Sequence, residues 1–255
     1  MWWRTTGFLT FLPIHAAGIY GEKAFPQSRL SDFVVSSYIP TLSSLITDYR
    51  LENRPNRQVL AVALPKESRL PGARQELDCI VHRVGSSNVK KLVESEATLE
   101  NVIAGMKDSS FVHFACHGVQ DATNPHESAL LLAKSSRLTL SHLHRLSLPH
   151  AQLAFLSACQ TATGDEILVQ EAVHLAAGML TTGYRGVVAT MWSIMDSDAP
   201  QVADEVYARL FEDCGSEPDP TQAAHALHHA VQKLLKNSKG KKSFLEWVPF
   251  IHIGI

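Results

Sequence analysis

Two short apolar segments each end in a side chain that can take part in covalent catalysis. Residues 111–118 have the sequence FVHFACHG and end near His117, and residues 153–161 have the sequence LAFLSACQT and contain Cys159. Both are apolar runs of the kind found in buried strands, and open α/β sheets place functional groups at the carboxyl ends of parallel strands. If the two strands are neighbours, the sequence predicts a thiol activated by an imidazole.

A cysteine that attacks a carbonyl needs a thiolate, a proton carrier and hydrogen-bond donors for the developing oxyanion. An adjacent imidazolium lowers the pKa of a thiol, so His117 would favour the thiolate of Cys159 and later protonate the leaving amine. Gly118 has no Cβ, which lets a substrate approach its N–H closely. The N–H groups of Gly118 and Cys159 are the expected oxyanion donors, each contributing about 3–4 kcal/mol in other enzymes.

Acidic and aromatic residues near these segments are candidates for a substrate pocket. Asp165 follows the segment that contains Cys159, and Trp192 and Asp196 follow a predicted strand. The two carboxylates could bind a basic substrate side chain or cap the next helix, and Trp192 could form a pocket wall or pack in the core. For Asp198, capping of the next helix is the favoured interpretation.

Two other residues of the first segment are assigned to the core. Cys116 alternates with His117 and should face the opposite side of the strand, and His113 should be a packed, hydrogen-bonded histidine deeper in the sheet. A zinc site that joins these residues to Cys159 is disfavoured, because residues 113 and 117 lie more than about 12 Å apart on an extended chain. No metal and no cofactor is expected, and GxGxxG, P-loop and GxSxG motifs do not occur.

The composition is that of an ordinary globular protein. The 255 residues are 45% hydrophobic and 19% charged, and the formal net charge is -2. This charge gives no electrostatic reason to expect nucleic-acid binding, and no apolar stretch is long enough to span a membrane. The four cysteines, Cys79, Cys116, Cys159 and Cys214, have no regular spacing, which favours a reducing compartment and a cytoplasmic location.

Segments with strand and helix character alternate along the chain. Strands are predicted at residues 7–12, 32–36, 58–64, 89–94, 110–117, 129–133, 151–158, 186–192 and 250–253. Helices are predicted at 41–49, 71–82, 98–106, 139–146, 171–182, 198–214 and 221–235, with Thr98 and Thr139 as N-caps. The alternation predicts an α/β fold with a mostly parallel sheet covered on both faces. No break resembles a domain boundary, so residues 1–255 are expected to form one domain.

Several blocks of the sequence resemble the CHAT domain of the caspase–separase class of cysteine peptidases. They are residues 114–118 (FACHG), 125–132, 156–162 (LSACQTA), 178–196 and 247–254 (WVPFIHIG). The resemblance covers essentially the whole chain and is weakest before residue 55. It implies a caspase-like three-layer αβα fold with a mostly parallel central sheet, His117 as general base and acid, and Cys159 as nucleophile.

The resemblance also implies an activity and a context. CHAT domains commonly lie C-terminal to tetratricopeptide (TPR) or similar repeats and take part in regulated proteolysis. Because this chain has no such repeats and starts abruptly, we expect it to be the C-terminal part of a longer repeat-containing protein. The expected function is a cysteine endopeptidase that cleaves a protein or peptide substrate under the control of a partner or an attached TPR-like domain.

Two alternatives to this function stay open. The family includes members with no demonstrated activity, so the chain could be a catalytically silent module for scaffolding or signalling. A third hypothesis is an acyltransferase or amidase that acts on a small substrate, for which a closed pocket would be expected. The resemblance does not place the acidic pocket residue of arginine- or lysine-specific relatives, so cleavage specificity is not assigned.

Overall fold

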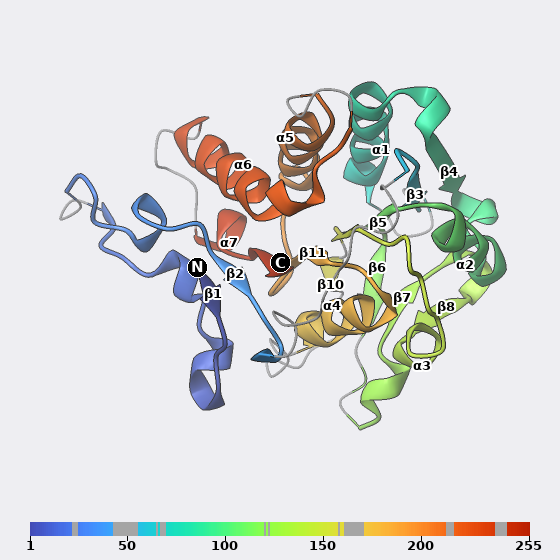
Figure 1. Ribbon diagram of the computed structural model, residues 1–255, viewed down its shortest axis with the longest axis horizontal. Helices are drawn as coiled ribbons and strands as arrows, with labels where there is room; N and C mark the ends of the chain where they lie inside the picture. The colour runs from blue at the N-terminus through green and yellow to red at the C-terminus, as the bar shows by residue number, and fades with distance from the viewer. Residues whose placement is uncertain are drawn as a thin grey trace.

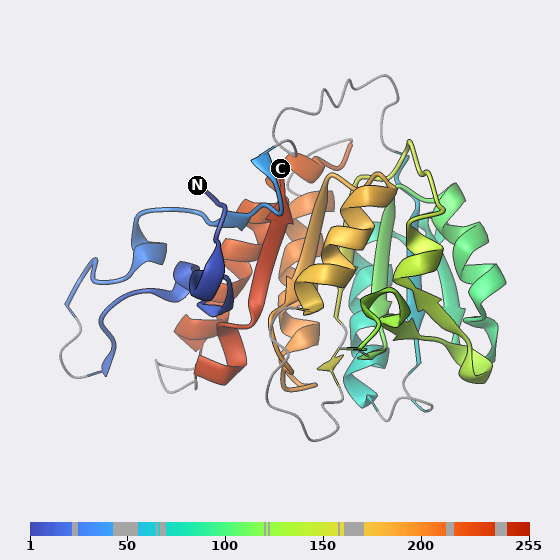
Figure 2. The ribbon, with the colours of Figure 1, turned by 90° about the horizontal axis from the view of Figure 1, so that it is seen from below.

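The computed structural model describes residues 1–21, 25–42, 56–64, 66, 70–119, 121, 123–157, 159–160, 171–212, 217–237 and 244–255. Helices cover both faces of a central sheet, and a segment that contains both short N-terminal strands extends to one side (Figures 1 and 2). The α/β fold expected from the sequence is confirmed. None of the helices in this part of the chain is both long and apolar enough to cross a lipid bilayer.

The central sheet has eight strands in the order β1-β2-β12-β11-β9-β5-β3-β4. The bounds are β1 (Trp2–Trp3), β2 (Ser37–Tyr38), β3 (Val59–Ala63), β4 (Val89–Val93), β5 (Phe111–Ala115), β9 (Leu153–Leu156), β11 (Gly186–Thr190) and β12 (Phe250–Gly254). Neighbouring strands are parallel except for the antiparallel pair β11–β12. The mostly parallel sheet is therefore confirmed.

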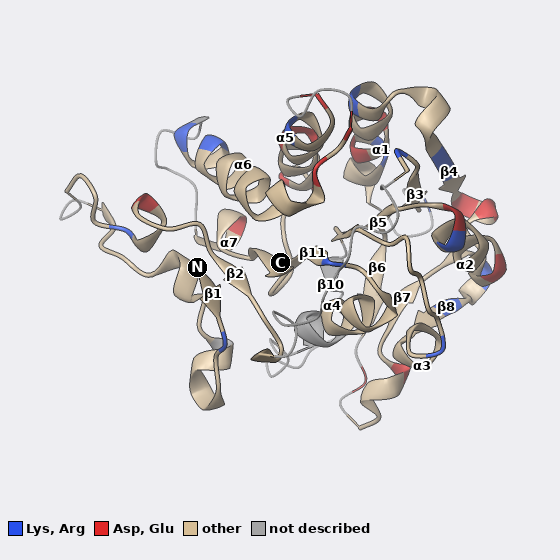
Figure 3. Ribbon diagram, in the orientation of Figure 1, with Lys and Arg blue, Asp and Glu red and all other residues tan. Residues whose placement is uncertain are grey.

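The middle of the sheet is apolar on both faces. Every residue of β3, β5, β9 and β11 is buried. Lys, Arg, Asp and Glu of the described residues lie on helices, loops, β4 and β8 but not on these four strands (Figure 3). Parallel strands between two helix layers must bury both faces, and this explains why they were recognisable as continuous apolar runs.

The helices form two layers. One face of the sheet is covered by α1 (Pro71–Val84), α5 (Ala199–Phe211), α6 (Ala223–Asn237) and α7 (Phe244–Trp247). The other is covered by α2 (Leu99–Asp108), α3 (Leu140–Leu143) and α4 (Glu171–Thr182). Alternate residues of β3 enter the two layers, with Val59 and Ala61 in the first and Leu60 and Val62 in the second. Short 3-10 helices lie at Gly7–Phe11, Ile14–Ala16, Leu30–Asp32, Ser86–Asn88, Glu94–Glu96, Pro125–Glu127, Ala133–Ser135 and Pro220–Gln222.

A helix is present at each predicted position from 71–82 onward, although the one predicted at 139–146 is shorter, at Leu140–Leu143. The predicted N-caps are also correct, because the side-chain oxygens of Thr98 and Thr139 accept hydrogen bonds from backbone N–H groups in the first turns of α2 and α3. The predicted helix at 41–49 falls largely outside the described residues. Gly183 ends α4 with φ +124°, and a Cβ there would lie 2.4 Å from the carbonyl oxygen of Leu148, so only glycine fits this turn.

A second, four-stranded sheet extends from the first and was not expected. Its order is β10 (Cys159–Gln160), β6 (His117–Val119), β7 (Ala129–Leu131) and β8 (Arg137–Thr139). The strand predicted at 110–117 is therefore broken after Ala115, and the strand predicted at 151–158 is present but shorter, at Leu153–Leu156. Central strands β5 and β9 end first, and the chain resumes strand structure in the small sheet because β7 offers β6 an antiparallel partner there.

The N-terminal segment differs most from the prediction. Residues 7–12 were expected to form a strand, but Gly7–Phe11 is a 3-10 helix, and no strand forms at 32–36. Phe8 is 90% exposed, so this part of the chain lacks the covering layer that a half-buried strand needs. The strand instead lies at Ser37–Tyr38, where it pairs with β1 and β12.

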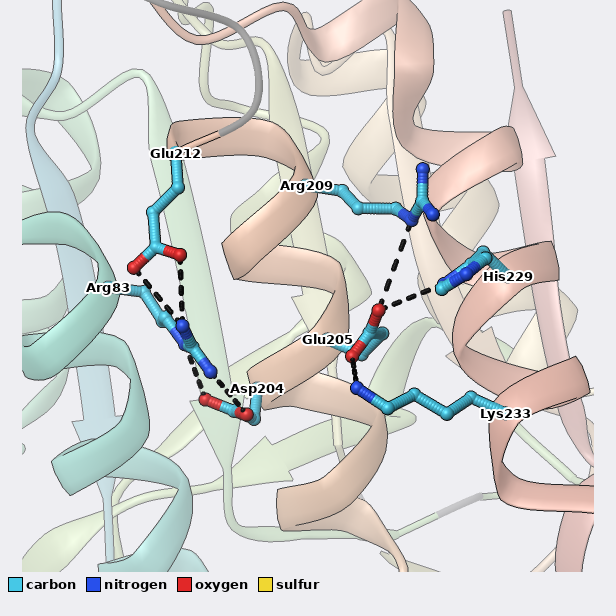
Figure 4. Close-up of polar contacts among 7 residues, drawn as sticks. All are labelled: Arg83, Asp204, Glu205, Arg209, Glu212, His229 and Lys233. Carbon is cyan, nitrogen blue, oxygen red and sulfur yellow. Dashed lines mark hydrogen bonds and ion pairs between the residues drawn. The ribbon is translucent and has the colours of Figure 1, made fainter. Parts of the chain in front are cut away.

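Ion pairs connect the outer helices α1, α5 and α6 (Figure 4). Arg83 of α1 donates to both carboxylate oxygens of Asp204, at 2.7 and 2.8 Å, and to Glu212, at 2.9 Å. The hydrogen bonds from Arg83 lower the pKa of Asp204. Glu205 of α5 pairs with Lys233 of α6 and, at 2.9 Å, with His229. These contacts hold α1 against α5 and α5 against α6.

Candidate active site

The segments that contain His117 and Cys159 lie on neighbouring parallel strands, as the sequence predicted. In the central sheet β5 and β9 pair directly, with His113 opposite Phe155. The same alignment continues in the small sheet, where Cys159 of β10 is the register partner of His117 of β6. Paired residues on neighbouring strands have Cα atoms about 4.8 Å apart. The backbone therefore brings these two residues together beyond the carboxyl ends of β5 and β9.

The exposure of the side chain can be given for His117 but not for Cys159. His117 is half-exposed and belongs to β6, and Gly118 beside it is buried and pairs with Gln160. The side chain of Cys159 lies outside the described part of the structure. The backbones of Cys159 and His117 are paired, and their catalytic dyad stays a prediction.

The core assignments of the neighbouring residues are confirmed. Cys116 is fully buried and belongs to the layer of α2, α3 and α4. His113 is 1% exposed, and its Nε2 lies 3.0 Å from Oε2 of Glu76 in α1. Its Nδ1 lies 3.4 Å from the hydroxyl of Tyr207 in α5, and its ring packs against Phe155 with centroids 4.7 Å apart. His113 therefore joins α1, β5 and α5 below the candidate site.

Glu76 is a buried carboxylate that the sequence analysis missed. It is 2% exposed and lies on the face of α1 that also buries Ala73, Leu77 and Ile80. An acidic residue among the core positions of an amphipathic helix was the available signal, because a carboxylate is buried only where a partner compensates it. The partner, His113, comes from a distant strand and could not be found from spacing.

We predict that Glu76→Ala lowers the free energy of unfolding by about 3–5 kcal/mol, because it leaves His113 buried without its acceptor. Glu76→Gln, which keeps a hydrogen-bonding group in place, should lose less than half as much. Urea denaturation measures the difference. Asp78→Ala is the matched control on the same helix, since this carboxylate is 65% exposed and should change stability by no more than about 0.5 kcal/mol. Equal losses for Glu76→Ala and Asp78→Ala would contradict the prediction.

The structure places the acidic residues singled out from the sequence in different environments. Asp165 lies outside the described residues. Asp196 accepts a hydrogen bond at 2.6 Å from the backbone N–H of Gly72, so its carboxylate meets the first turn of α1 and not the helix that follows it in the chain. Asp198 occupies the N-cap position of α5 but makes no side-chain capping bond, so its predicted role was wrong. Its φ of -92° and ψ of -31° are helical, whereas a capping side chain needs extended backbone.

Trp192 lies just beyond the carboxyl end of β11. It is half-buried and packs against both core layers. Gly186 of β11 pairs with Leu153 of β9 in parallel, so Trp192 and Cys159 both follow the carboxyl ends of neighbouring strands. From the sequence, Trp192 could be a core residue or a pocket wall, and its partial exposure at this edge fits both roles. Among the described residues, no three His, Cys, Asp or Glu side chains gather in a way that could hold a metal ion.

Comparison with known proteins decides the family. The model of the CHAT domain family matches residues 1–255. The chain belongs to the CHAT domain family. This confirms the resemblance noted in the sequence. A comparison with curated protein sequences gives no significant match to this CHAT domain.

Solved structures similar to the CHAT domain include cysteine peptidases. Gingipain R, an Arg-specific cysteine proteinase, superimposes with a TM-score of 0.58 at 17% identity, over 86% of this chain and 53% of gingipain R. A complex of the Porphyromonas gingivalis RgpB pro- and mature domains gives 0.52 at 16%, over 78% and 47%. The Saccharomyces cerevisiae separase–securin complex gives 0.57 at 13%, over 89% and 14%. The CHAT domain thus has the caspase-like fold and spans about half the length of gingipain R.

Proposed function

We propose that this CHAT domain is a cysteine endopeptidase with Cys159 as nucleophile and His117 as proton carrier. The observation that carries the proposal is the pairing of Cys159 with His117 in register on parallel strands β10 and β6. Residues that are directly paired on adjacent strands lie on the same face of a sheet, so a thiol and an imidazole at these positions can interact. The caspase-like fold supports the same reaction class, as an argument from analogy.

The proposed reaction is acyl transfer in two steps. His117 takes the proton of the Cys159 thiol, and the thiolate attacks the scissile carbonyl carbon to form a C–S bond. The backbone N–H groups of Gly118 and Cys159 stabilise the oxyanion, and the His117 imidazolium protonates the leaving amine as the C–N bond breaks. A water molecule, deprotonated by His117, then hydrolyses the thioester and releases the carboxylic acid and the thiol.

The proposal includes a pocket and a form of control. Trp192, which follows the carboxyl end of β11, would form one wall, and Asp165 would offer a carboxylate to a basic substrate side chain. A partner or an attached repeat domain would regulate the enzyme. Two of the similar structures are complexes, one of RgpB pro- and mature domains and one of separase with securin.

The test is a cleavage-site profile of a whole proteome treated with the intact protein and with His117→Ala. We expect new protein N-termini with the intact protein and a loss of about 10²–10⁴-fold in cleavage rate with His117→Ala, because the thiol then lacks its base and the amine its acid. His126→Ala is the control, since this exposed histidine lies in the 3-10 helix before β7 and the variant should cleave normally. Absence of new termini, or identical termini from His117→Ala, would favour a catalytically silent module.

A further inference from the structure

The N-terminus of α1 is capped by a residue from a distant loop. Leu70, at the N-cap position, has no side chain that can accept a hydrogen bond, and no acidic residue occurs in the first turn. The first N–H groups of a helix need acceptors and favour a negative charge. Asp196 supplies both, because its Oδ2 lies 2.6 Å from the N–H of Gly72.

The contact between α1 and this loop is close enough to require glycine. A Cβ on Gly72 would lie 2.2 Å from the carbonyl oxygen of Asp196 and 2.7 Å from its Oδ1. No side chain fits at that separation, so the backbone of α1 touches the loop directly. The hydrogen bond and the absence of a side chain at residue 72 act together to seat the loop on the helix.

The loop of residues 191–198 connects β11 to α5, and several of its residues contact the rest of the fold. Its first residue, Met191, is buried and donates its backbone N–H to the carbonyl oxygen of Pro249, at 2.8 Å. Ile194 is 8% exposed and packs in the same core layer as Ala73 and Leu77 of α1. Trp192 lies between these attachment points, beyond the carboxyl end of β11, so the position of its ring depends on how the loop contacts α1.

We propose that Asp196 is a positioning residue, which anchors the 191–198 loop to α1 through Gly72 and thereby fixes Trp192 as a wall of the substrate site. This inference rests on the proposed peptidase function for the site itself, although the anchor is a property of the fold. It assigns to Asp196 a role other than direct binding of a basic substrate side chain. Such binding would compete with the hydrogen bond from Gly72.

The experiment measures covalent labelling by two electrophilic peptides that differ only in the residue before the electrophile, arginine in one and leucine in the other. For Asp196→Ala we expect the concentration for half-maximal labelling to rise about tenfold with both peptides, because a lost charge-assisted hydrogen bond has about this effect. The maximal labelling rate should change far less. Asp196→Asn should restore most of the affinity, since its amide oxygen can still accept from Gly72.

Direct substrate binding predicts a different pattern. Asp196→Ala would then impair only the arginine peptide, and Asp196→Asn would not restore it. Either observation overturns the proposal. Gly72→Ala does not alter the Asp196 side chain, but its Cβ should push the 191–198 loop away from α1. It should therefore weaken labelling by both peptides. Asp78→Ala, which removes an exposed carboxylate from the same helix, should leave labelling unchanged.

Hydrogen exchange of the backbone amides separates this inference from the proposed function. In Asp196→Ala, the amides of residues 191–198 and of the first turn of α1 should exchange about tenfold faster than in the unmodified protein, even if no peptide labels any variant. If no protein is labelled but amide exchange is faster in Asp196→Ala, the proposed peptidase function is refuted and the anchoring role of Asp196 is supported. Unchanged amide exchange in Asp196→Ala would refute the anchoring role of Asp196, whatever the labelling shows.

Discussion

Replacement of Cys159 by alanine is expected to abolish covalent labelling of the CHAT domain by an electrophilic peptide, whereas Cys116→Ala should label as well as the unmodified protein. The difference follows from position. Cys159 is the register partner of His117, which would hold its thiol as the reactive thiolate. Cys116 is fully buried in the core, where a peptide cannot reach it. Mass spectrometry of the intact protein measures the one added peptide.

The remaining cysteines define the controls. Cys79 of α1 is half-buried, and burial raises the pKa of its thiol, which makes it a poorer nucleophile. Cys79→Ser should therefore label normally. Because Cys116→Ala removes a buried side chain, its unfolding transition must be compared with that of the unmodified protein before its labelling is interpreted. Undiminished labelling of Cys159→Ala would refute the assignment of the nucleophile.

The second large effect is expected in mild acid, where the domain should lose several kcal/mol of stability as the pH falls from 6.5 to about 4. Burial lowers the pKa of both His15 and His252 from 6.5 to about 4. The unfolded chain binds protons at these residues from pH 6.5 downward, and the folded chain binds them only near pH 4. Stability therefore decreases with falling pH across this window, by roughly 3 kcal/mol for each histidine.

Both histidines connect the N-terminal segment to the rest of the fold. The ring of His15 lies 2.8 Å from the hydroxyl of Tyr38 and 2.9 Å from the carbonyl oxygen of Val248. His252, in β12, has its Nδ1 2.7 Å from Oγ of Ser37. Protonation of either ring would place a charge in a dry environment, so acid should loosen the attachment of β1 and β2 first.

Chemical denaturation at about pH 7, 5.5 and 4 measures this dependence. His252→Asn removes one titrating group, so its stability should fall by roughly 3 kcal/mol less between pH 6.5 and 4 than that of the unmodified protein, whatever its starting value. His150→Asn, in an exposed turn, should follow the unmodified protein. A curve for His252→Asn that is parallel to the unmodified protein would show that His252 does not drive the acid sensitivity.

The sequence was sufficient to predict the strands that are buried on both faces. Strands β3, β5, β9 and β11 are buried on both faces, so their residues must be apolar throughout, and a run of this kind can be recognised without knowledge of its partners. The amphipathic helices α1, α5 and α6 and the threonine caps of α2 and α3 also depend on residues that are close in sequence. The family blocks around His117 and Cys159 were apparent for the same reason.

The tertiary structure alone decided features that depend on residues far apart in the chain. Residues 7–11 have strand-like composition but no layer to cover them, and they form a 3-10 helix. The ends of the segments around His117 and Cys159 separate into a second sheet because β7 pairs with β6. Glu76 found its partner in β5, and Asp196 capped α1 instead of α5. Which residues are buried and which form hydrogen bonds depends on which elements pack together in the folded chain. The residues close in sequence do not reveal these contacts.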